Sequence, residues 1–435
     1  MSIESGNSLY GAQDKVGSMN IKLFAIVVGL VLVLLVSLVV IQSLPIATVR
    51  GTEPNVYVGI DAAFDNETVT ALIDEVSSYT NLFIVGCTAI TEKETRLNNI
   101  CQYLFDKGMS FIIYQDVPLG YNQDPRLPVN QTRPLNATNS QYPPASANFT
   151  SLRQPSNFTR PFPANTVSNW THIAKERWGT HFLGIYYIDE LAGRQLDLAS
   201  GWVEVRNATD YTDAANQFNR TVSRSVNWYR NGYSDGADLS LFSSDYALYQ
   251  FDYDTGYDVI LAQLGWNYSR QLNIALCRGA ATVANKDWGV IVTWEYTEPP
   301  YLESSSKLYD DMVLAYNNGA KYIVVFDSNE AYTQSVLTHD HLDALKQFWQ
   351  YTKENPRSNS SSGDRVGFVL PADYAYGFRG PTDSIWGLWK ADSFSMNLSI
   401  NVGDKLTQYG EKLDIVYNQT QLEASGYKQL IYWDS

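Results

Sequence analysis

The chain has 435 residues, of which 45% are hydrophobic and 13% aromatic, so it can build a sizeable core and does not resemble a disordered chain. Its net charge of −15 argues against nucleic-acid binding, which depends on Lys and Arg side chains that neutralise phosphates. The same charge disfavours peripheral binding to anionic lipid. The cysteines, Cys87, Cys101 and Cys277, lack a C-x-x-C spacing, so we expect buried thiols, or one Cys87–Cys101 bridge, rather than a zinc site.

An apolar run occupies residues 23–41 and is interrupted only by Gly29 and Ser37. As a helix, a run of this length nearly spans a hydrocarbon core of ~30 Å, and it exceeds the ~7–15 apolar residues of a cleaved signal peptide. Lys15 and Lys22 precede it, which favours a cytoplasmic N-terminus. We therefore expect a cytoplasmic tail (1–22), a single-pass transmembrane helix (23–41) and a tether (42–55).

Twelve N-x-[ST] sequons agree with this orientation, because all of them follow the predicted anchor. They begin at Asn66, Asn130, Asn136, Asn148, Asn157, Asn169, Asn207, Asn219, Asn267, Asn359, Asn397 and Asn418. We expect a cell-membrane glycoprotein whose C-terminal part is extracellular.

Residues 56–354 alternate between short apolar runs, which indicate strands, and segments with apolar residues at helical spacing. The expected strands are 56–61, 82–87, 110–115, 182–189, 238–243, 258–263, 289–294 and 321–327. The expected helices are 67–79, 97–108, 213–232, 270–285, 306–318 and 339–352. Eight apolar strands, mostly separated by helices, predict an α/β fold with a parallel sheet, and their number favours a closed (β/α)8 TIM barrel. No Gly-rich phosphate motif follows the first strand, which argues against a dinucleotide site.

Three other segments stand apart from this alternation. Residues 116–170 are rich in Pro, Asn, Ser and Thr and hold five of the sequons, which predicts a long glycosylated loop. Residues 355–364 read as a linker. Residues 365–435 read as a small C-terminal α/β appendage, which is too short to be very stable unless it packs on the barrel. Its aromatic turn, 378–389, could reach the mouth of the barrel.

Acidic and aromatic residues follow the expected strands, at the end of the barrel where TIM-barrel proteins carry function. They are Asp61, Asp189, Glu190, Asp245, Trp266, Trp294, Glu295 and Glu298. None of the four histidines ends a strand, so we expect no metal site, and we expect no cofactor. Glycoside hydrolysis needs one carboxyl group to protonate the leaving oxygen and a second to attack or to activate water, and this mouth offers both.

The chain resembles the clan A glycoside hydrolase barrels, in which a Glu acid/base follows the fourth strand and a Glu nucleophile ends the seventh. Glu190 and Glu295 match those positions. The resemblance implies that these two residues are catalytic. The residues expected to bind substrate are Asp61, Asp189, Asp245, Trp266, Trp294 and Glu298. Asp189 stands where these enzymes often have Asn, the residue that usually contacts the sugar 2-hydroxyl.

The chain shows two further resemblances. The sequence "EYTEPPYLE" (295–303) has the spacing E-x-x-E-x-x-x-x-E of the endo-acting α-mannosidases, which would give Glu295 and Glu298 joint roles and leave Glu190 to bind substrate. The whole chain also resembles a group of membrane-anchored archaeal proteins that share the stretch "LYDDMVLAYNNGAKYIVVFDS" (308–328) and carry no established activity.

Two functions remain open at this point. The first is a cell-surface glycoside hydrolase that acts on polysaccharide or glycan by a two-carboxylate mechanism. The second is a non-catalytic glycan-binding or cell-envelope protein on the same scaffold. The Asn267 sequon favours the second, because a glycan beside Trp266 would crowd a substrate. No feature of the sequence indicates an oligomeric state.

Overall fold

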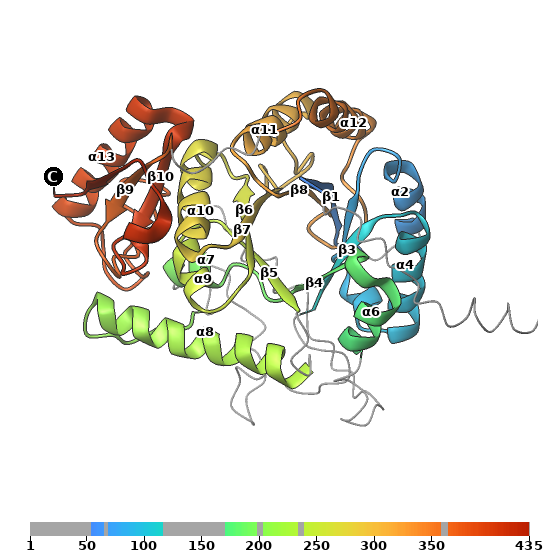
Figure 1. Ribbon diagram of the computed structural model, residues 1–435, viewed down its shortest axis with the longest axis horizontal. Coiled ribbons are helices and arrows are strands. Elements are labelled where there is room, and N and C mark those ends of the chain that lie inside the picture. The colour runs from blue at the N-terminus through green and yellow to red at the C-terminus, as the bar shows by residue number, and fades with distance from the viewer. Residues whose placement is uncertain are drawn as a thin grey trace, which may run out of the picture. The chain divides into compact units, whose positions relative to one another are not determined.

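The computed structural model describes residues 54–64, 68–115, 170–197, 203–233, 239–357 and 364–434 (Figure 1). The predicted cytoplasmic tail, the predicted transmembrane helix and nearly all of the predicted glycosylated loop lie outside these residues. In the described part of the chain, no helix is both long and apolar enough to cross a membrane. Residues Asn55–Ser435 form one compact unit.

Eight parallel strands close into a barrel in chain order, so the predicted TIM barrel is confirmed. They are β1 (Tyr57–Ala62), β2 (Leu82–Val85), β3 (Ser110–Tyr114), β4 (Phe182–Tyr186), β5 (Ser240–Asp245), β6 (Val259–Leu264), β7 (Asp287–Val292) and β8 (Tyr322–Asp327). The barrel closes where β1 pairs with β8, with Tyr57 opposite Tyr322. Nearly every strand residue is buried, as expected for a sheet that has side chains inside it and helices outside it.

Ten helices of the described chain accompany these strands (Figure 1). They are α2 (Val69–Val76), α3 (Thr88–Thr91), α4 (Glu94–Asp106), α6 (Trp170–Trp178), α7 (Leu191–Leu196), α8 (Tyr211–Tyr233), α9 (Tyr249–Asp254), α10 (Arg270–Ala284), α11 (Ser305–Asn317) and α12 (His339–Glu354). Side chains cap the N-termini of three of the longer ones, which explains where they begin: Ser269 caps α10, Ser304 caps α11 and Thr338 caps α12.

A second sheet of three parallel strands lies at the C-terminal end of the chain, in the order β10 (Leu413–Tyr417), β9 (Val366–Leu370), β11 (Gln429–Tyr432). Helix α13 (Ser393–Tyr409) connects β9 to β10. We call residues 364–434 the C-terminal unit. It packs on α10 of the barrel: a Cβ atom added to Gly279 would lie 2.4 Å from the carbonyl oxygen of Ile415. Only glycine permits this close approach of the helix to β10.

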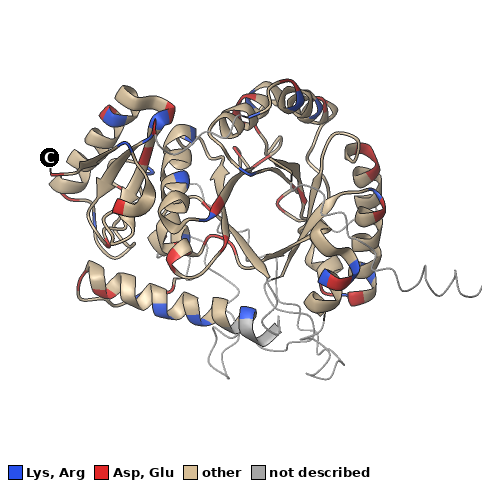
Figure 2. Ribbon diagram, viewed as in Figure 1, with Lys and Arg blue, Asp and Glu red and all other residues tan. Residues whose placement is uncertain are grey.

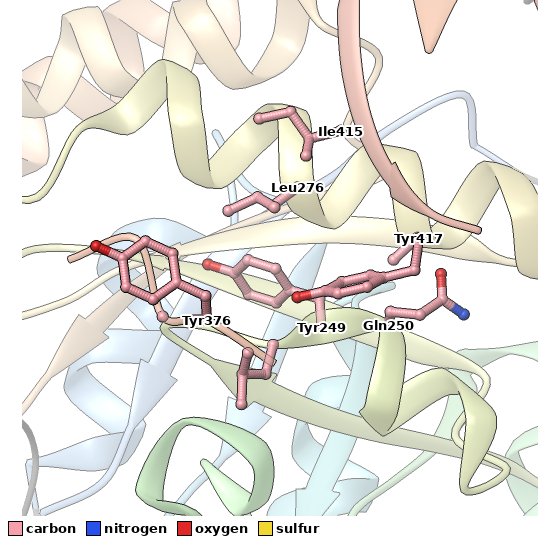
Figure 3. A pocket seen from close by; sticks show the side chains of 9 residues that line it. Tyr249, Gln250, Leu276, Tyr376, Ile415 and Tyr417 are labelled. Atoms are coloured by element: carbon pink, nitrogen blue, oxygen red, sulfur yellow. The ribbon is translucent and has the colours of Figure 1, made fainter. Parts of the chain in front are cut away.

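A small cavity lies between the barrel and the C-terminal unit (Figure 3). Its walls come from α9, α10 and the C-terminal unit, and include Tyr249, Gln250, Leu276, Tyr376 and Tyr417. It has room for about one water molecule. A cavity of that size is a packing defect, not a substrate site. The three cysteines are free thiols, and all of them are buried.

Candidate functional site

A group of hydrogen-bonded polar side chains lies inside the barrel at the carboxyl ends of β4, β5 and β6. Phe242 of β5 and Tyr322 of β8 make an edge-to-face contact, and because these strands are not neighbours, both rings point inward. Ser244 is two residues beyond Phe242 and therefore points inward as well. Tyr186, in register with Phe242, donates a hydrogen bond to Ser244 (2.5 Å). Gln263 also donates to Ser244 Oγ, at 3.0 Å.

Glu190 belongs to this group. The Gln263 side-chain amide donates to Glu190 Oε1 at 2.7 Å, and Glu190 is fully buried. The backbone N–H of Glu190 donates to the carbonyl of Ser244 at 2.7 Å. These bonds fix the carboxyl group against the ends of β5 and β6. The expected catalytic residue of the fourth strand therefore lies inside the mouth of the barrel.

The backbone that carries Glu190 is strained. Ile188 has φ 49° and Glu190 has φ 59°, a left-handed region that β-branched residues in particular avoid. Ser243 Oγ donates to the carbonyl of Ile188 at 2.7 Å, and the Arg194 guanidinium donates to the carbonyls of Asp189 (2.8 Å) and Glu190 (3.0 Å). Backbone strain of this kind costs about 1–3 kcal/mol per residue and is most often found at functional sites.

Asp189 and Asp61 are buried near the same end of the barrel, each only 1% exposed. Asp61 is in register with Ile84 and with Phe326. Gly86 makes room for its carboxyl group, because a Cβ atom there would lie 2.0 Å from Asp61 Oδ1. The barrel mouth therefore holds buried acidic groups, as the sequence predicted, although neither of these aspartates is open to solvent.

Glu295 belongs to a different group, formed around Arg270 at the start of α10. Glu295 Oε2 accepts from Arg270 (2.9 Å) and Glu295 Oε1 from Lys307 of α11 (3.0 Å). Arg270 also bonds Glu303 and Asp311, each at 2.8 Å. Burial acts to raise the pKa of Glu295, but the hydrogen bonds from Arg270 and Lys307 outweigh it, so this pKa lies below its usual value. Burial and the charge of Asp311 raise the pKa of Glu303 to about 7.

The two predicted catalytic residues are thus held by different partners. Side chains of β5 and β6 surround Glu190, whereas the first turns of α10 and α11 hold both carboxylate oxygens of Glu295. Glu298 is exposed, and its carbonyl accepts from the N–H of Tyr301 in the loop after β7.

The two predicted aromatic platforms lie together beyond β6 and β7. The rings of Trp266 and Trp294 are T-shaped, with centroids 6.3 Å apart. Trp294 is 3% exposed, and its indole N–H donates to the carbonyl of Ser328 at 2.8 Å. Trp266 is partly exposed, so of the two rings it is the better placed to meet a ligand.

Asp245 organises the loops around α7. Its carboxylate accepts from the backbone N–H groups of Ala192 and Gly193 at the start of α7, and from those of Tyr246 and Ala247. Burial raises the pKa of Asp245 to about 6 despite these bonds. Burial and the charge of Asp245 raise the pKa of the neighbouring Asp252 well above its usual value.

The C-terminal unit also contacts α7, the helix that follows Glu190. The carbonyl of Trp386 accepts from the Gln195 amide (3.0 Å), and Ser384 Oγ donates to the carbonyl of Leu196 (3.1 Å). Arg379 forms an ion pair with Asp197 at 3.0 Å. The predicted aromatic turn of this unit therefore reaches α7 and supports the segment that carries Glu190.

Sequence reasoning missed several of these residues. Tyr186, Ser244, Gln263 and Arg194 are neutral or basic, and a search for carboxyl pairs passes over them. One signal was present: Gln263 is a polar residue inside the apolar run "VILAQL", two positions beyond the inward-facing Leu261.

In the described chain, no group of three or more His, Cys, Asp or Glu residues is placed to hold a metal ion. Lys and Arg are interspersed with acids over the helices rather than gathered on one face (Figure 2).

No protein-family model matches this sequence, and no curated protein matches it. Solved structures of similar fold include a beta-galactosidase from the psychrophilic Marinomonas ef1, with a TM-score of 0.50 and 12% identity, over 86% of this chain and 72% of that one. A GH5_18 structure from Streptomyces cattleya in complex with GlcNAc has a TM-score of 0.47 and 11% identity, over 87% and 98% of the two chains. The alpha-L-fucosidase isoenzyme 2 from Paenibacillus thiaminolyticus has 0.49 and 14%, over 86% and 59%. At 12% identity the likeness to the first of these structures shows the fold alone, an eight-stranded α/β barrel.

Proposed function

We propose that this protein binds a carbohydrate at the carboxyl end of its barrel and hydrolyses a glycosidic bond there. The observation that carries the proposal is Glu190, a fully buried carboxyl group on strained backbone at the end of β4, which Gln263 holds toward the barrel interior. Strained backbone conformations such as this one persist mainly at sites where function requires that geometry. That similar folds occur in glycoside hydrolases supports this reaction class.

The proposed roles follow from the surroundings of the two glutamates. Arg270 and Lys307 hold Glu295 in its charged form, because they lower its pKa. A charged carboxylate is what a nucleophile or general base must be, which leaves Glu190 as the general acid that protonates the leaving oxygen. Asp61, Asp189 and Trp266 would contact the sugar.

One observation favours the second candidate, a glycan-binding barrel without hydrolysis. Both oxygens of Glu295 are bonded to cations, and a carboxylate held in this way often stabilises a structure rather than reacting. A glycan on Asn267, whose side chain is exposed beside Trp266, would also narrow the mouth.

The experiment is a screen of the full chain against neutral and acidic oligosaccharides, with hydrolysis and binding measured separately. Glu190→Gln and Glu295→Gln should each lower the hydrolysis rate by about 10²–10⁴-fold, the usual contribution of a general acid or base. Glu354→Gln is the matched control, because Glu354 is exposed at the last residue of α12 and follows none of the strand ends at the mouth. Hydrolysis that survives both substitutions would refute the assignment. Binding without hydrolysis by the wild type would favour the second candidate.

The location of the protein is part of the proposal. The apolar run 23–41 and the sequons beyond it support a single-pass membrane protein with the barrel outside the cell. Protease treatment of intact cells should release the barrel, and deglycosylation should lower its apparent mass. A barrel that is protected until the cells are lysed would rule this location out.

A further inference from the structure

Three buried polar atoms at the ends of β6 and β7 have no hydrogen-bond partner in the part of the chain that the structure describes. They are the Oε1 atom of Gln263, the hydroxyl of Thr293 and the indole nitrogen of Trp266. Gln263 is 2% exposed and Thr293 is 1% exposed. Buried polar groups are bonded in the great majority of cases, so each exception requires a specific explanation.

These three atoms belong to adjacent segments of backbone. Gln263 is in register with Ile291 of β7, so Thr293, two residues further along, points to the same inward face. The N–H of Thr293 donates to the carbonyl of Leu264 at 2.9 Å, and the N–H of Trp266 donates to the carbonyl of Trp294 at 3.0 Å. The ends of the two strands therefore hold the three groups on one side of the mouth.

The same groups adjoin Glu190. The Gln263 amide nitrogen is bonded to the Glu190 carboxyl group, so its unpartnered oxygen is on the other branch of the same amide. Trp266 is partly exposed whereas the other two are buried, which puts the open side of this region at the Trp266 ring. The result is a hydrogen-bond acceptor, a hydroxyl and an indole N–H beside the carboxyl group to which we assign the chemistry.

The charges nearby restrict the kind of ligand. The described cations around the mouth are already bonded. Arg270, Lys307 and Arg379 pair with carboxylates, and Arg194 donates to the carbonyls of Asp189 and Glu190. Buried acids lie at the same end of the barrel. Among the described residues, an anionic sugar would meet these acids without an uncommitted cation to balance it, so this part of the site suits a neutral ligand.

We propose that Gln263, Thr293 and Trp266 form a binding subsite for a neutral sugar, whose hydroxyl groups pair with their three unpartnered atoms. Sugar hydroxyls both donate and accept, which matches the acceptor, the hydroxyl and the donor that the subsite offers. The inference rests on the proposed function, because it places a sugar next to Glu190.

The test uses two substitutions in the full chain, Thr293→Val and Trp266→Phe, each of which removes an unpartnered polar atom. Thr293→Val keeps the shape of the side chain, so the stability of the ligand-free protein in thermal unfolding should stay the same or rise. Trp266→Phe also removes part of the aromatic ring system, so it should lower stability through lost packing, but by less than the Trp294→Phe control described next. Two matched controls remove groups that do have partners. They are Thr80→Val, whose hydroxyl donates to the carbonyl of Val76 (2.9 Å), and Trp294→Phe, whose indole donates to the carbonyl of Ser328 (2.8 Å). Both controls should lower stability.

The second measurement is calorimetric titration with the neutral oligosaccharides that the wild type binds. Thr293→Val and Trp266→Phe should each weaken binding by about 5- to 10-fold, as expected for one lost hydrogen bond, while Thr80→Val binds as the wild type does. Lower stability of Thr293→Val without ligand, together with a loss for Trp266→Phe as large as that for Trp294→Phe, would show that the atoms have partners within the fold, and would overturn the inference. Unchanged affinity in both variants would also overturn it and leave the proposed function standing if Glu190→Gln still abolishes hydrolysis. A wild type that binds acidic but no neutral oligosaccharides would overturn the inference alone, whereas one that binds no oligosaccharide would overturn both the inference and the proposed function.

Discussion

Arg278 of α10 joins the barrel to the C-terminal unit, so Arg278→Met should destabilise the whole protein. Its Nε atom lies 2.6 Å from Asp414 Oδ1, and the two side chains are 5% and 0% exposed. Its other nitrogens donate to Asn318 Oδ1 at 2.6 Å and to the carbonyls of Glu411 and Leu413 at 2.7 and 2.9 Å. Methionine fills a similar volume and satisfies none of these acceptors.

Removing one partner of a buried ion pair costs about 3–5 kcal/mol, because the other charge is left buried. Here Asp414 keeps two other donors, Arg365 (2.9 Å) and the hydroxyl of Tyr427 (2.9 Å). We therefore expect Arg278→Met to lower the free energy of unfolding by about 3 kcal/mol, the lower end of that range. Arg365→Met is the matched control, since this side chain is 23% exposed and should cost only about 1 kcal/mol.

The assay is urea unfolding of the full chain, monitored by tryptophan fluorescence, and the free energy of unfolding is extrapolated linearly to water. The wild type should unfold in one transition, since α10 holds both parts together, and Arg278→Met should unfold at lower urea or in two steps. The double variant Arg278→Met/Asp414→Leu should recover part of the loss, because no unpaired buried charge remains. A single variant within about 1 kcal/mol of the wild type would contradict the reasoning.

Three further predictions concern the surroundings of the two glutamates. Burial raises the folded pKa of Asp245 to about 6, above its unfolded value of about 4, so this group stabilises the protein most below pH ~4 and loses that contribution as the pH rises through 6. Burial raises the pKa of Asp252 as well, so Asp252→Asn, which removes one titrating carboxyl group, should make the unfolding free energy fall less steeply with pH, and parallel curves would contradict this. Gly193→Ala should cost about 1–3 kcal/mol and lower activity, because its Cβ would lie 2.2 Å from Asp245 Oδ1. Gly403→Ala in α13, with no atom within 4 Å of its added Cβ, should instead stabilise by about 0.5–1 kcal/mol. Lys307→Met removes one cation from Glu295, so the acidic limb of the pH–rate profile should move to higher pH, and an unmoved limb would exclude Glu295 from the reaction.

The barrel could be predicted because its strands are long apolar runs. The sixth, expected at 258–263, forms at Val259–Leu264, a shift of one residue. The short helices α7 and α9 were missed, because six residues span less than two helical turns and show no reliable period. Both follow a residue with positive φ, Glu190 and Leu248, which no apolar pattern reveals.

The site could be predicted only as a set of strand ends. The sequence predicts that Glu190 and Glu295 follow the carboxyl ends of two strands, as they do in the structure, but the direction of a side chain depends on the backbone beyond the strand. Glu295 turns to Arg270, which precedes it by 25 residues, and Glu190 turns to Gln263, which follows it by 73. The residues next to Glu190 and Glu295 in the sequence do not indicate partners that lie so far along the chain.

The support of α7 by the C-terminal unit has a consequence for biosynthesis. Gln195 and the Trp386 carbonyl that it bonds are 191 positions apart, so a ribosome makes the β4–α7 segment long before it makes the support. Throughout that interval the strained turn at Ile188 and Glu190 lacks the contacts that hold it from outside. A chain that stalls after β8 already contains Gln263 and Ser244, which fix the Glu190 carboxyl group, but it lacks every contact of the C-terminal unit with α7. The order of synthesis thus makes the support of α7 one of the last contacts that can form in the new chain.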